Sequence, residues 1–285
     1  MRRQMRVVVT GGAGQLARDI ERRWTHEGDD VVSLTRDQVD VSRRDDVLGA
    51  ITSLQPDMVV NCAAWTAVDA CEGDPERAFS VNALGVRWVR EACERAGVHL
   101  VQVSTDYVFD GTLHRPYLEW DRPDPRSVYG ASKLGGEREA GPDATIVRTS
   151  WVCGEHGNNM VRTVLRLVTE RSSLSFVDDQ RGCPTFTTDL ADAVRRLAVD
   201  RRSGVYHVTN AGAVSWYEFV RDIVAAAGYD PAIVHPITTA DLDPRRPAAR
   251  PANSVLDNAA MRMSGLPPMR HYREPLHDLV TRLRA

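Results

Sequence analysis

The feature that most constrains the fold is a glycine-rich turn near the amino terminus, between an apolar run and an amphipathic stretch. Residues 7–10 (VVVT) have the composition of a buried strand, and residues 11–17 (GGAGQLA) follow as a Gly-x-x-Gly-x-x-Ala turn that opens a helix. Glycine permits a positive φ at such a turn and lets the backbone approach a pyrophosphate at the helix amino terminus. Ala17 is small enough for close packing of the helix on the strand. The pattern predicts a dinucleotide-binding unit.

Strand-like and helix-like segments alternate through the first half of the chain. We expect strands at 6–10, 30–35, 58–62, 98–104 and 145–149, and helices at 14–26, 45–54, 75–96 and 128–138. Alternation of this kind predicts a parallel sheet with helices on both faces. The fold class is therefore α/β, a Rossmann-type doubly wound parallel sheet.

The second half is less regular, with helices expected at 159–170, 189–198, 216–227 and 273–284, a strand at 204–209 and a loop at 243–251. We interpret this half as a smaller carboxy-terminal α/β lobe that binds substrate. Residues 1–150 plus about 185–210 would form the dinucleotide-binding domain. Residues about 151–184 and 211–285 would form the substrate lobe.

Composition excludes several classes of function. The net charge of −3 offers no basic field for nucleic acid or for a membrane surface. No apolar run approaches the ~20 residues of a membrane span, and the amino terminus lacks the pattern of a secretory signal, so we expect a cytoplasmic protein. The five cysteines are scattered without a C-x-x-C pair, which argues against a disulfide framework and against a metal site.

The end of the second expected strand bears on the choice of cofactor. A cation there accepts the 2′-phosphate of NADP, whereas a carboxylate binds the ribose hydroxyls of NAD. Arg36 favours NADPH, but Asp37 is adjacent, so NADH stays open. Asp40 and Val41 are candidates for contact with the adenine.

Three residues form a candidate catalytic constellation. Thr105 ends the strand at 98–104, and ligands of open α/β sheets bind beyond the carboxyl ends of strands. Tyr129 and Lys133 are four residues apart, which places them on one face of a helix. Lys133 is the only lysine in the chain, and an ammonium has a tunable pKa that a guanidinium lacks. We interpret Tyr129 as the general acid for a carbonyl reduced by hydride, with Thr105 orienting the carbonyl oxygen.

In this interpretation Lys133 also lowers the pKa of Tyr129. A neighbouring ammonium favours the phenolate. Bringing a phenol from ~10 to ~7 needs about 4 kcal/mol, which one partly desolvated charge can supply together with a cationic nicotinamide.

These residues resemble the extended short-chain dehydrogenase/reductases and, within them, the dTDP-4-dehydrorhamnose reductase family. The resemblance covers nearly the whole chain. It is carried by residues 104–111 (STDYVFDG), 128–133 (VYGASK), 149–152 (TSWV), 157–159 (GNN), 178–180 with 183–185 (DDQ, CPT), 215–219 (SWYEF) and 250–254 (RPANS).

The resemblance implies roles for individual residues. Thr105, Tyr129 and Lys133 would be the catalytic trio. The cofactor would contact Gly11, Gly14, Gln15, Leu16, Arg36, Asp40, Val41, Ala63, Ala64, Tyr129 and Lys133. The substrate would contact Thr66, Val68, Thr105, Asp106, Tyr107, Trp151 and Arg250, although Trp151 could equally be a core aromatic and Arg250 a solvated loop residue. Some family members dimerise through a metal held by carboxylates. Asp19 and Asp189 lie near matching positions but are not Glu, so we expect no metal.

The expected activity is NAD(P)H-dependent reduction of the C4 ketone of a dTDP-4-keto-6-deoxy-L-hexose, giving dTDP-L-rhamnose or a related deoxysugar. A homodimer stays open. Three alternatives also stay open: a 4-keto reductase for another nucleotide deoxysugar of an antibiotic pathway, an epimerase or dehydratase, and a regulatory subunit that binds NADP without turnover. Asp106-Tyr107 stands where the resembling dehydratases carry an Asp-Glu pair, which argues against the epimerase or dehydratase.

Overall fold

A computed structural model describes residues 4–284 of the chain. Residues 1–3, where we expect no secretory signal, and residue 285 lie outside the described residues.

The larger part of the molecule is built on one parallel sheet of six strands. Its strands, in spatial order, are β10 (Gly204–His207), β5 (Thr145–Thr149), β4 (His99–Thr105), β3 (Met58–Asn61), β1 (Arg6–Thr10) and β2 (Asp30–Leu34). Every neighbouring pair in this sheet is parallel. This arrangement confirms the expected α/β, Rossmann-type doubly wound fold.

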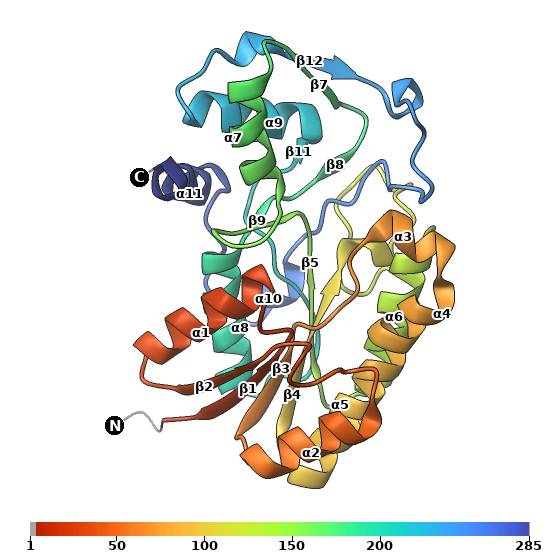
Figure 1. Ribbon diagram of the computed structural model, residues 1–285, viewed down its shortest axis with the longest axis vertical. Helices are drawn as coiled ribbons and strands as arrows, with labels where there is room; N and C mark the ends of the chain where they lie inside the picture. Colours follow the sequence, from red (N-terminus) through yellow and green to blue (C-terminus); the bar gives the residue numbers. More distant parts are fainter. Residues whose placement is uncertain (1–3, 285) are drawn as a thin grey trace.

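Helices cover both faces of the sheet (Figure 1). One face carries α2 (Arg44–Leu54), α5 (Gly85–Ala96) and α6 (Val128–Ala140), and the other carries α1 (Gln15–His26), α8 (Thr187–Val199) and the short α10 (Ala259–Met263). The sequence 75–96, expected as one helix, is α4 (Pro75–Phe79), a π-helical turn η1 (Ser80–Leu84) and α5. The short helix α3 (Val68–Gly73), which precedes α4, has no counterpart in the sequence-based expectation.

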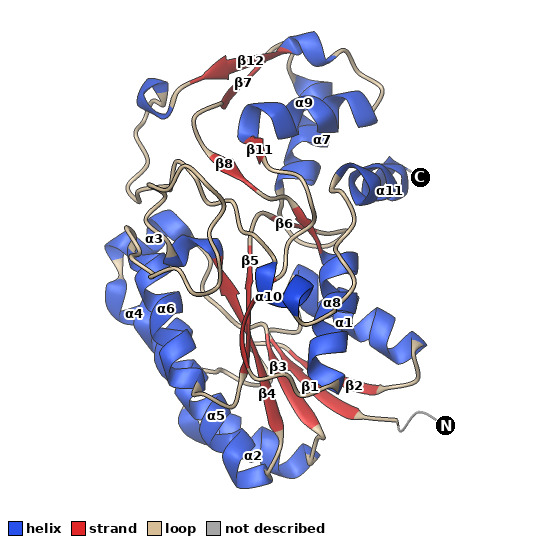
Figure 2. Ribbon diagram, turned by 180° about the vertical axis from the view of Figure 1, so that it is seen from behind, coloured by secondary structure: helices blue, strands red, loops and turns tan. Residues whose placement is uncertain are grey.

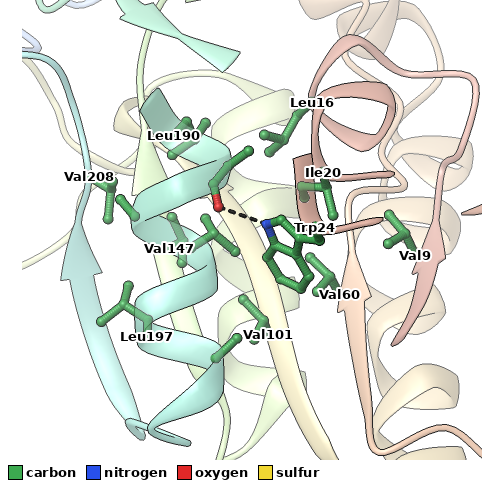
Figure 3. Packing of buried hydrophobic residues seen from close by; sticks show 14 of the residues in the cluster. Val9, Leu16, Ile20, Trp24, Val60, Val101, Val147, Leu190, Leu197 and Val208 are labelled. Carbon is green, nitrogen blue, oxygen red and sulfur yellow. Dashed lines mark hydrogen bonds between the residues drawn. The ribbon is translucent and has the colours of Figure 1, made fainter. Parts of the chain in front are cut away.

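The core between the sheet and the α1/α8 layer is fully apolar at its centre. Trp24 of α1 is completely buried, and its indole Nε1 donates to the carbonyl oxygen of Ala191 in α8 at 3.0 Å (Figure 3). Val9, Val60 and Val147 approach the same ring from three strands (Figure 3). The hydrogen bond satisfies the one polar atom of the buried indole, so α1 and α8 pack without a desolvation penalty at that point.

A smaller lobe lies beyond the carboxyl ends of the sheet strands (Figure 2). Its helices are α7 (Met160–Glu170), α9 (Trp216–Ala226) and α11 (Arg273–Arg284). Its short strands are β6 (Val152–Cys153), β7 (Leu174–Val177), β8 (Arg181–Gly182), β9 (Thr185–Phe186), β11 (Val214–Ser215) and β12 (Val234–Ile237). The remaining short turns are η2 (Asp106–Val108), η3 (Pro231–Ile233) and η4 (Thr239–Asp241).

The chain passes between the two lobes several times. It leaves the sheet after β5, returns through α8 and β10, and leaves again toward β11. Met261 and Met269 then pack into the same apolar cluster as Val9 and Leu190, against the sheet. The assignment of 1–150 plus about 185–210 to the cofactor and of about 151–184 and 211–285 to the substrate stays a prediction.

Candidate active site

The glycine turn has the shape that a dinucleotide pyrophosphate requires. Gly11 has φ +71°, and a Cβ there would lie 2.7 Å from the backbone nitrogen of Ala63. The Gly14 N–H donates to the Gly11 carbonyl at 2.8 Å, and α1 begins at the next residue. No acidic side chain lies in the first turn of α1, so the amino end of the helix keeps its positive field. The residues present fit a pyrophosphate.

Gln15 connects this turn to the smaller lobe. Its amide Nε2 donates to the carbonyl of Val152 at 3.1 Å, and its Oε1 accepts from Asn159 at 3.3 Å. Asn159 also caps α7 by accepting from the Arg162 N–H. Leu16, by contrast, is buried in the apolar cluster of α1 and α8, so its side chain packs in the core.

A cavity of about 380 Å³ lies beyond the end of β2 and is lined by Arg36, Ser42, Asp74, Glu76, Arg77, Ser80 and Val81. The Arg36 side chain is 70% exposed and lies 3.6 Å from a carboxylate oxygen of Asp40. Hydrogen bonds from Ser42 hold the pKa of Asp40 below its ordinary value, with Arg36 contributing to the same effect. Val41 is buried beneath this region.

Four further residues expected at the site lie after β3. Ala63 and Ala64 are half-buried, and the Ala63 N–H donates to the Asn61 side chain at 3.2 Å. Thr66 is exposed, and Val68 begins α3. Ala63 lies against the glycine turn, because a Cβ at Gly11 would lie within 2.7 Å of its backbone nitrogen.

Thr105, Tyr129 and Lys133 are brought together beyond β4. Thr105 ends β4, and α6 carries the other two residues after its cap, Ser127. All three are buried. The Tyr129 hydroxyl lies near Thr105, while the Lys133 ammonium donates to the carbonyl of Val103 at 2.7 Å.

The expected lowering of the Tyr129 pKa is not what the structure shows. Burial raises the pKa of this phenol above its ordinary value, and the nearby Thr105 hydroxyl only partly opposes that rise. The Lys133 ammonium donates to the carbonyl of Val103. Burial also lowers the pKa of Lys133 to about 8. Tyr129 is therefore a protonated phenol at neutral pH.

Asp106 lies directly behind Thr105. Its Oδ1 accepts from the Thr105 hydroxyl at 3.0 Å, while its Oδ2 is buried without a partner among the described residues. Burial raises the pKa of this carboxyl to about 6. Next to it, the Tyr107 ring meets the Tyr129 ring edge-on, with 5.5 Å between centroids.

Arg250 is neither solvated nor free to turn. Its side chain is only 9% exposed and forms an ion pair with Asp69 of α3, in which Nη2 and Oδ2 are 2.6 Å apart. Its charge also opposes the rise that burial causes in the Tyr107 pKa, so the guanidinium lies near that phenol.

Trp151 packs as an aromatic of the smaller lobe. Its ring is stacked on Trp216, with centroids 3.5 Å apart and planes 8° apart, and it lies beside Phe219. Its backbone has φ +47°, a strained conformation for a bulky residue. A contact between Trp151 and substrate stays a prediction.

Comparison with known proteins identifies the family. Residues 5–285 match the RmlD substrate binding domain family. The dTDP-4-dehydrorhamnose reductase of Streptomyces griseus is 42% identical over 282 residues, which cover 96% of this chain and 92% of that protein.

The chain belongs to the RmlD family.

Two further relatives agree. A probable dTDP-4,6-dihydroxy-2-methyloxan-3-one 4-ketoreductase of Streptomyces antibioticus is 42% identical over 281 residues, 96% of this chain and 94% of that protein. The crystal structure of dTDP-4-dehydrorhamnose reductase from Bacillus anthracis str. Ames in complex with NADP has a TM-score of 0.94 and 35% identity, and the match covers 98% of this chain and 100% of that chain. The protein is thus an extended short-chain dehydrogenase/reductase, an NAD(P)H-dependent oxidoreductase of the dTDP-4-dehydrorhamnose reductase type.

Two residues of this RmlD-family reductase were missed by sequence reasoning. Glu137 follows Lys133 by four residues, so the helical spacing that linked Tyr129 to Lys133 could have found it. Arg77 lines the cavity with Arg36, and no local signal marks it, because α4 and β2 meet only in the folded chain.

The carboxylates considered for a metal have protein partners instead. Asp19 accepts from Thr187 and Arg22, and Asp189 accepts from Arg270 and Asn210. Within residues 4–284 no group of three or more His, Cys, Asp or Glu side chains has an arrangement that could hold a metal ion. Over the same range no helix is long and apolar enough to cross a membrane.

Proposed function

We propose that the protein reduces the C4 ketone of a dTDP-4-keto-6-deoxy-L-hexose with NADPH, forming dTDP-L-rhamnose or a closely related deoxysugar. The observation that carries the proposal is the buried cluster of Thr105, Tyr129 and Lys133 at the carboxyl end of β4, opposite a glycine turn that fits a pyrophosphate.

Each residue of the catalytic cluster has its own role in the proposed reaction. Bound NADPH would supply the hydride. The Tyr129 hydroxyl then donates its proton to the oxygen of the reduced carbonyl, a role that suits a phenol kept protonated by burial. Thr105, which lies near Tyr129, orients that oxygen. Lys133 holds α6 on β4 through Val103 and, as the family resemblance implies, would also bond the nicotinamide ribose.

The substrate would lie between the lobes, against Thr66, Val68, Asp106, Tyr107, Trp151 and Arg250. Support comes from the electrostatic effect of Arg250 on Tyr107 and from the ring contact between Tyr107 and Tyr129. These contacts join a guanidinium, which suits a pyrophosphate, to the catalytic phenol through one residue.

NADPH is the proposed cofactor in preference to NADH. Arg36 and Arg77 line one cavity at the end of β2, where a 2′-phosphate would lie. The Bacillus anthracis relative was crystallised with NADP.

A second candidate function is the reduction of a different dTDP-linked 4-keto sugar. The Streptomyces antibioticus ketoreductase is as similar to this chain as the Streptomyces griseus reductase is. The groups that would move hydride and proton act at C4, so they would not discriminate among sugars that differ at C2, C3 or C5.

The test is NADPH oxidation with two substrates, dTDP-4-keto-L-rhamnose and its 3-deoxy analogue, by the purified protein. Turnover preferring the first by at least ~10-fold supports the rhamnose assignment, because a lost substrate hydrogen bond costs about that much. Equal rates of NADPH oxidation with the two substrates would support the second candidate function, the reduction of a different dTDP-linked 4-keto sugar. A Tyr129→Phe variant is the negative control. Its kcat is expected to fall at least ~100-fold while NADP⁺ binding is retained.

A further inference from the structure

Tyr129, Lys133 and Glu137 lie along one face of α6, four residues apart. Glu137 is 6% exposed. Its Oε1 accepts from the Ser104 hydroxyl at 2.6 Å and from Arg148 Nε at 2.8 Å, and its Oε2 accepts from Arg148 Nη2 at 2.7 Å. One carboxylate therefore joins α6 to β4 and to β5.

The register of the sheet explains the convergence. Ser104 on β4 is paired directly with Arg148 on β5, so both side chains leave the sheet on the same face, toward α6. Ser104 lies between Val103, whose carbonyl accepts from the Lys133 ammonium, and Thr105, whose hydroxyl lies near Tyr129. Three consecutive residues of β4 thus contact three successive turns of α6.

The charges around Lys133 are few. Its ammonium is buried, and desolvation lowers its pKa, whereas Glu137 on its own helix and Cys62 after β3 raise it. The groups facing the neighbouring Tyr129 are Asp106, Tyr107 and Cys71. Burial raises the pKa of Cys62 to about 12, so this thiol is neutral. Among the groups that act on Lys133, Glu137 is then the anion, and its own partner Arg148 on β5 carries the opposing charge.

We propose that Glu137 is a positioning residue, whose buried carboxylate holds α6 on β4 and β5 and supplies the negative charge next to Lys133 on the same helix face. The inference rests on the proposed roles of Tyr129 and Lys133 in ketone reduction. A purely structural role would make a different prediction, because a buried ion pair can be replaced by neutral side chains of similar volume with little loss of stability. In that case the protonation of Lys133 would be unchanged.

The unique lysine allows a direct test. Protein labelled with ¹³C at lysine Cε gives a single lysine NMR resonance, and its pH titration reports Lys133. The test variant is Glu137→Gln/Arg148→Met, which removes both charges of the buried pair. We expect its Lys133 pKa to fall by about one unit, and the alkaline limb of kcat against pH to move equally toward lower pH. The matched control is Ser104→Ala, which removes a hydrogen bond to Glu137 and leaves its charge. It should keep the Lys133 pKa within ~0.3 unit of the wild-type value.

The Lys133 titration distinguishes the proposed role of Glu137 from a purely structural one. A folded double variant whose Lys133 pKa stays within ~0.3 unit of wild type overturns the proposal. Folding is checked by near-ultraviolet circular dichroism and by NADP⁺ binding. If the double variant does not fold, Glu137→Gln takes its place, because it removes the carboxylate charge and keeps the Arg148 side chain, and the same limit of ~0.3 unit decides. The titration needs no keto sugar, so failure of the proposed function leaves its result intact.

Discussion

The nearly buried Arg250 forms an ion pair with Asp69, whose side chain is 40% exposed, and this pair ties the chain leading back from the smaller lobe to α3 of the Rossmann lobe. The Ala248 N–H donates to the same carboxylate at 3.1 Å, so Asp69 holds the backbone of this segment as well as its guanidinium. Arg250 lowers the pKa of Asp69, which keeps the carboxylate ionised. The segment before it, 243–247, is exposed. Asp69 thus anchors residues 243–250, a segment that we call the strap and that lies beside Tyr107.

We predict that Asp69→Asn loosens this strap. The variant loses the ion pair and leaves Arg250 partly unpaired, so the exposed residues before it should open more often. Limited trypsin digestion followed by mass spectrometry measures cleavage after Arg245, which should quicken at least ~5-fold, about 1 kcal/mol of local opening. Asp37→Asn, in the exposed turn after β2, is the control. An unchanged rate in Asp69→Asn would show that the strap is held by other contacts.

Asp106 predicts a specific dependence of stability on pH. Burial raises its pKa to about 6 from an ordinary value near 4, so the folded state binds a proton that the unfolded state releases. Stability from this group is therefore present below about pH 4 and is lost as pH rises to about 6 and beyond. Asp106→Asn removes the titration. Between pH 5 and pH 8, the fall in the free energy of unfolding should be about 1 kcal/mol smaller in the variant. Urea unfolding at both pH values measures it, and equal falls would contradict a raised pKa.

The close contact between Gly182 and the Trp151 ring predicts that a side chain at residue 182 would disturb the position of the indole. A Cβ on Gly182 would lie 2.6 Å from the Trp151 ring, so Gly182→Ala must displace the indole from its stack on Trp216. We expect a stability loss of about 1–3 kcal/mol and, if Trp151 contacts substrate, a KM for the keto sugar raised several-fold. The Kd for NADP⁺ should stay within twofold.

Gly49→Ala is the matched control for this variant. A Cβ at Gly49, in α2, meets nothing within 4 Å, and alanine favours the helix. Its stability should rise or stay level, with unchanged KM. A raised KM in both variants would trace the effect to something other than the Trp151 ring.

Arg36 and Arg77 predict the cofactor preference. Removing either cation should weaken NADPH binding by about 1.5–3 kcal/mol, which lowers the affinity ~10–100-fold. The affinity for NADH should change little. Calorimetric titration of Arg36→Ala and Arg77→Ala with NADP⁺ and NAD⁺ measures the ratio of the two Kd values. Arg43→Ala, an exposed arginine outside the cavity lining, is the control. If only Arg36→Ala changes the ratio, Arg77 does not contact the 2′-phosphate.

The sequence-based expectations were most accurate where the signal is local. The glycine turn, the helix at 14–26 and the alternation of strands and helices follow from hydrogen-bonding geometry and burial over a few residues, and the fold class is confirmed. The short strands of the smaller lobe were not predicted. β6, β8, β9 and β11 are two residues long, so no periodicity can reveal them, and their pairing depends on distant segments.

The candidate site divides in the same way. The spacing of Tyr129 and Lys133 placed them on one helix face, and the end of β4 placed Thr105 near them. The roles assigned to these residues stay predictions. The direction of the Tyr129 pKa was wrong, because the spacing of four residues does not say that the Lys133 ammonium turns to Val103 or that the phenol is buried.

The sequence by itself determined the Rossmann-type fold, the pyrophosphate-binding turn and the family, because each depends on contiguous residues or on a fixed helical spacing. Only the tertiary structure decided that Glu137 meets Ser104 and Arg148, that Arg250 meets Asp69, and that Asp106 is buried with one oxygen unpartnered. These contacts join residues far apart in the chain. Their geometry depends on the register of neighbouring strands and on which groups lose their water, and neither quantity can be computed from a single segment.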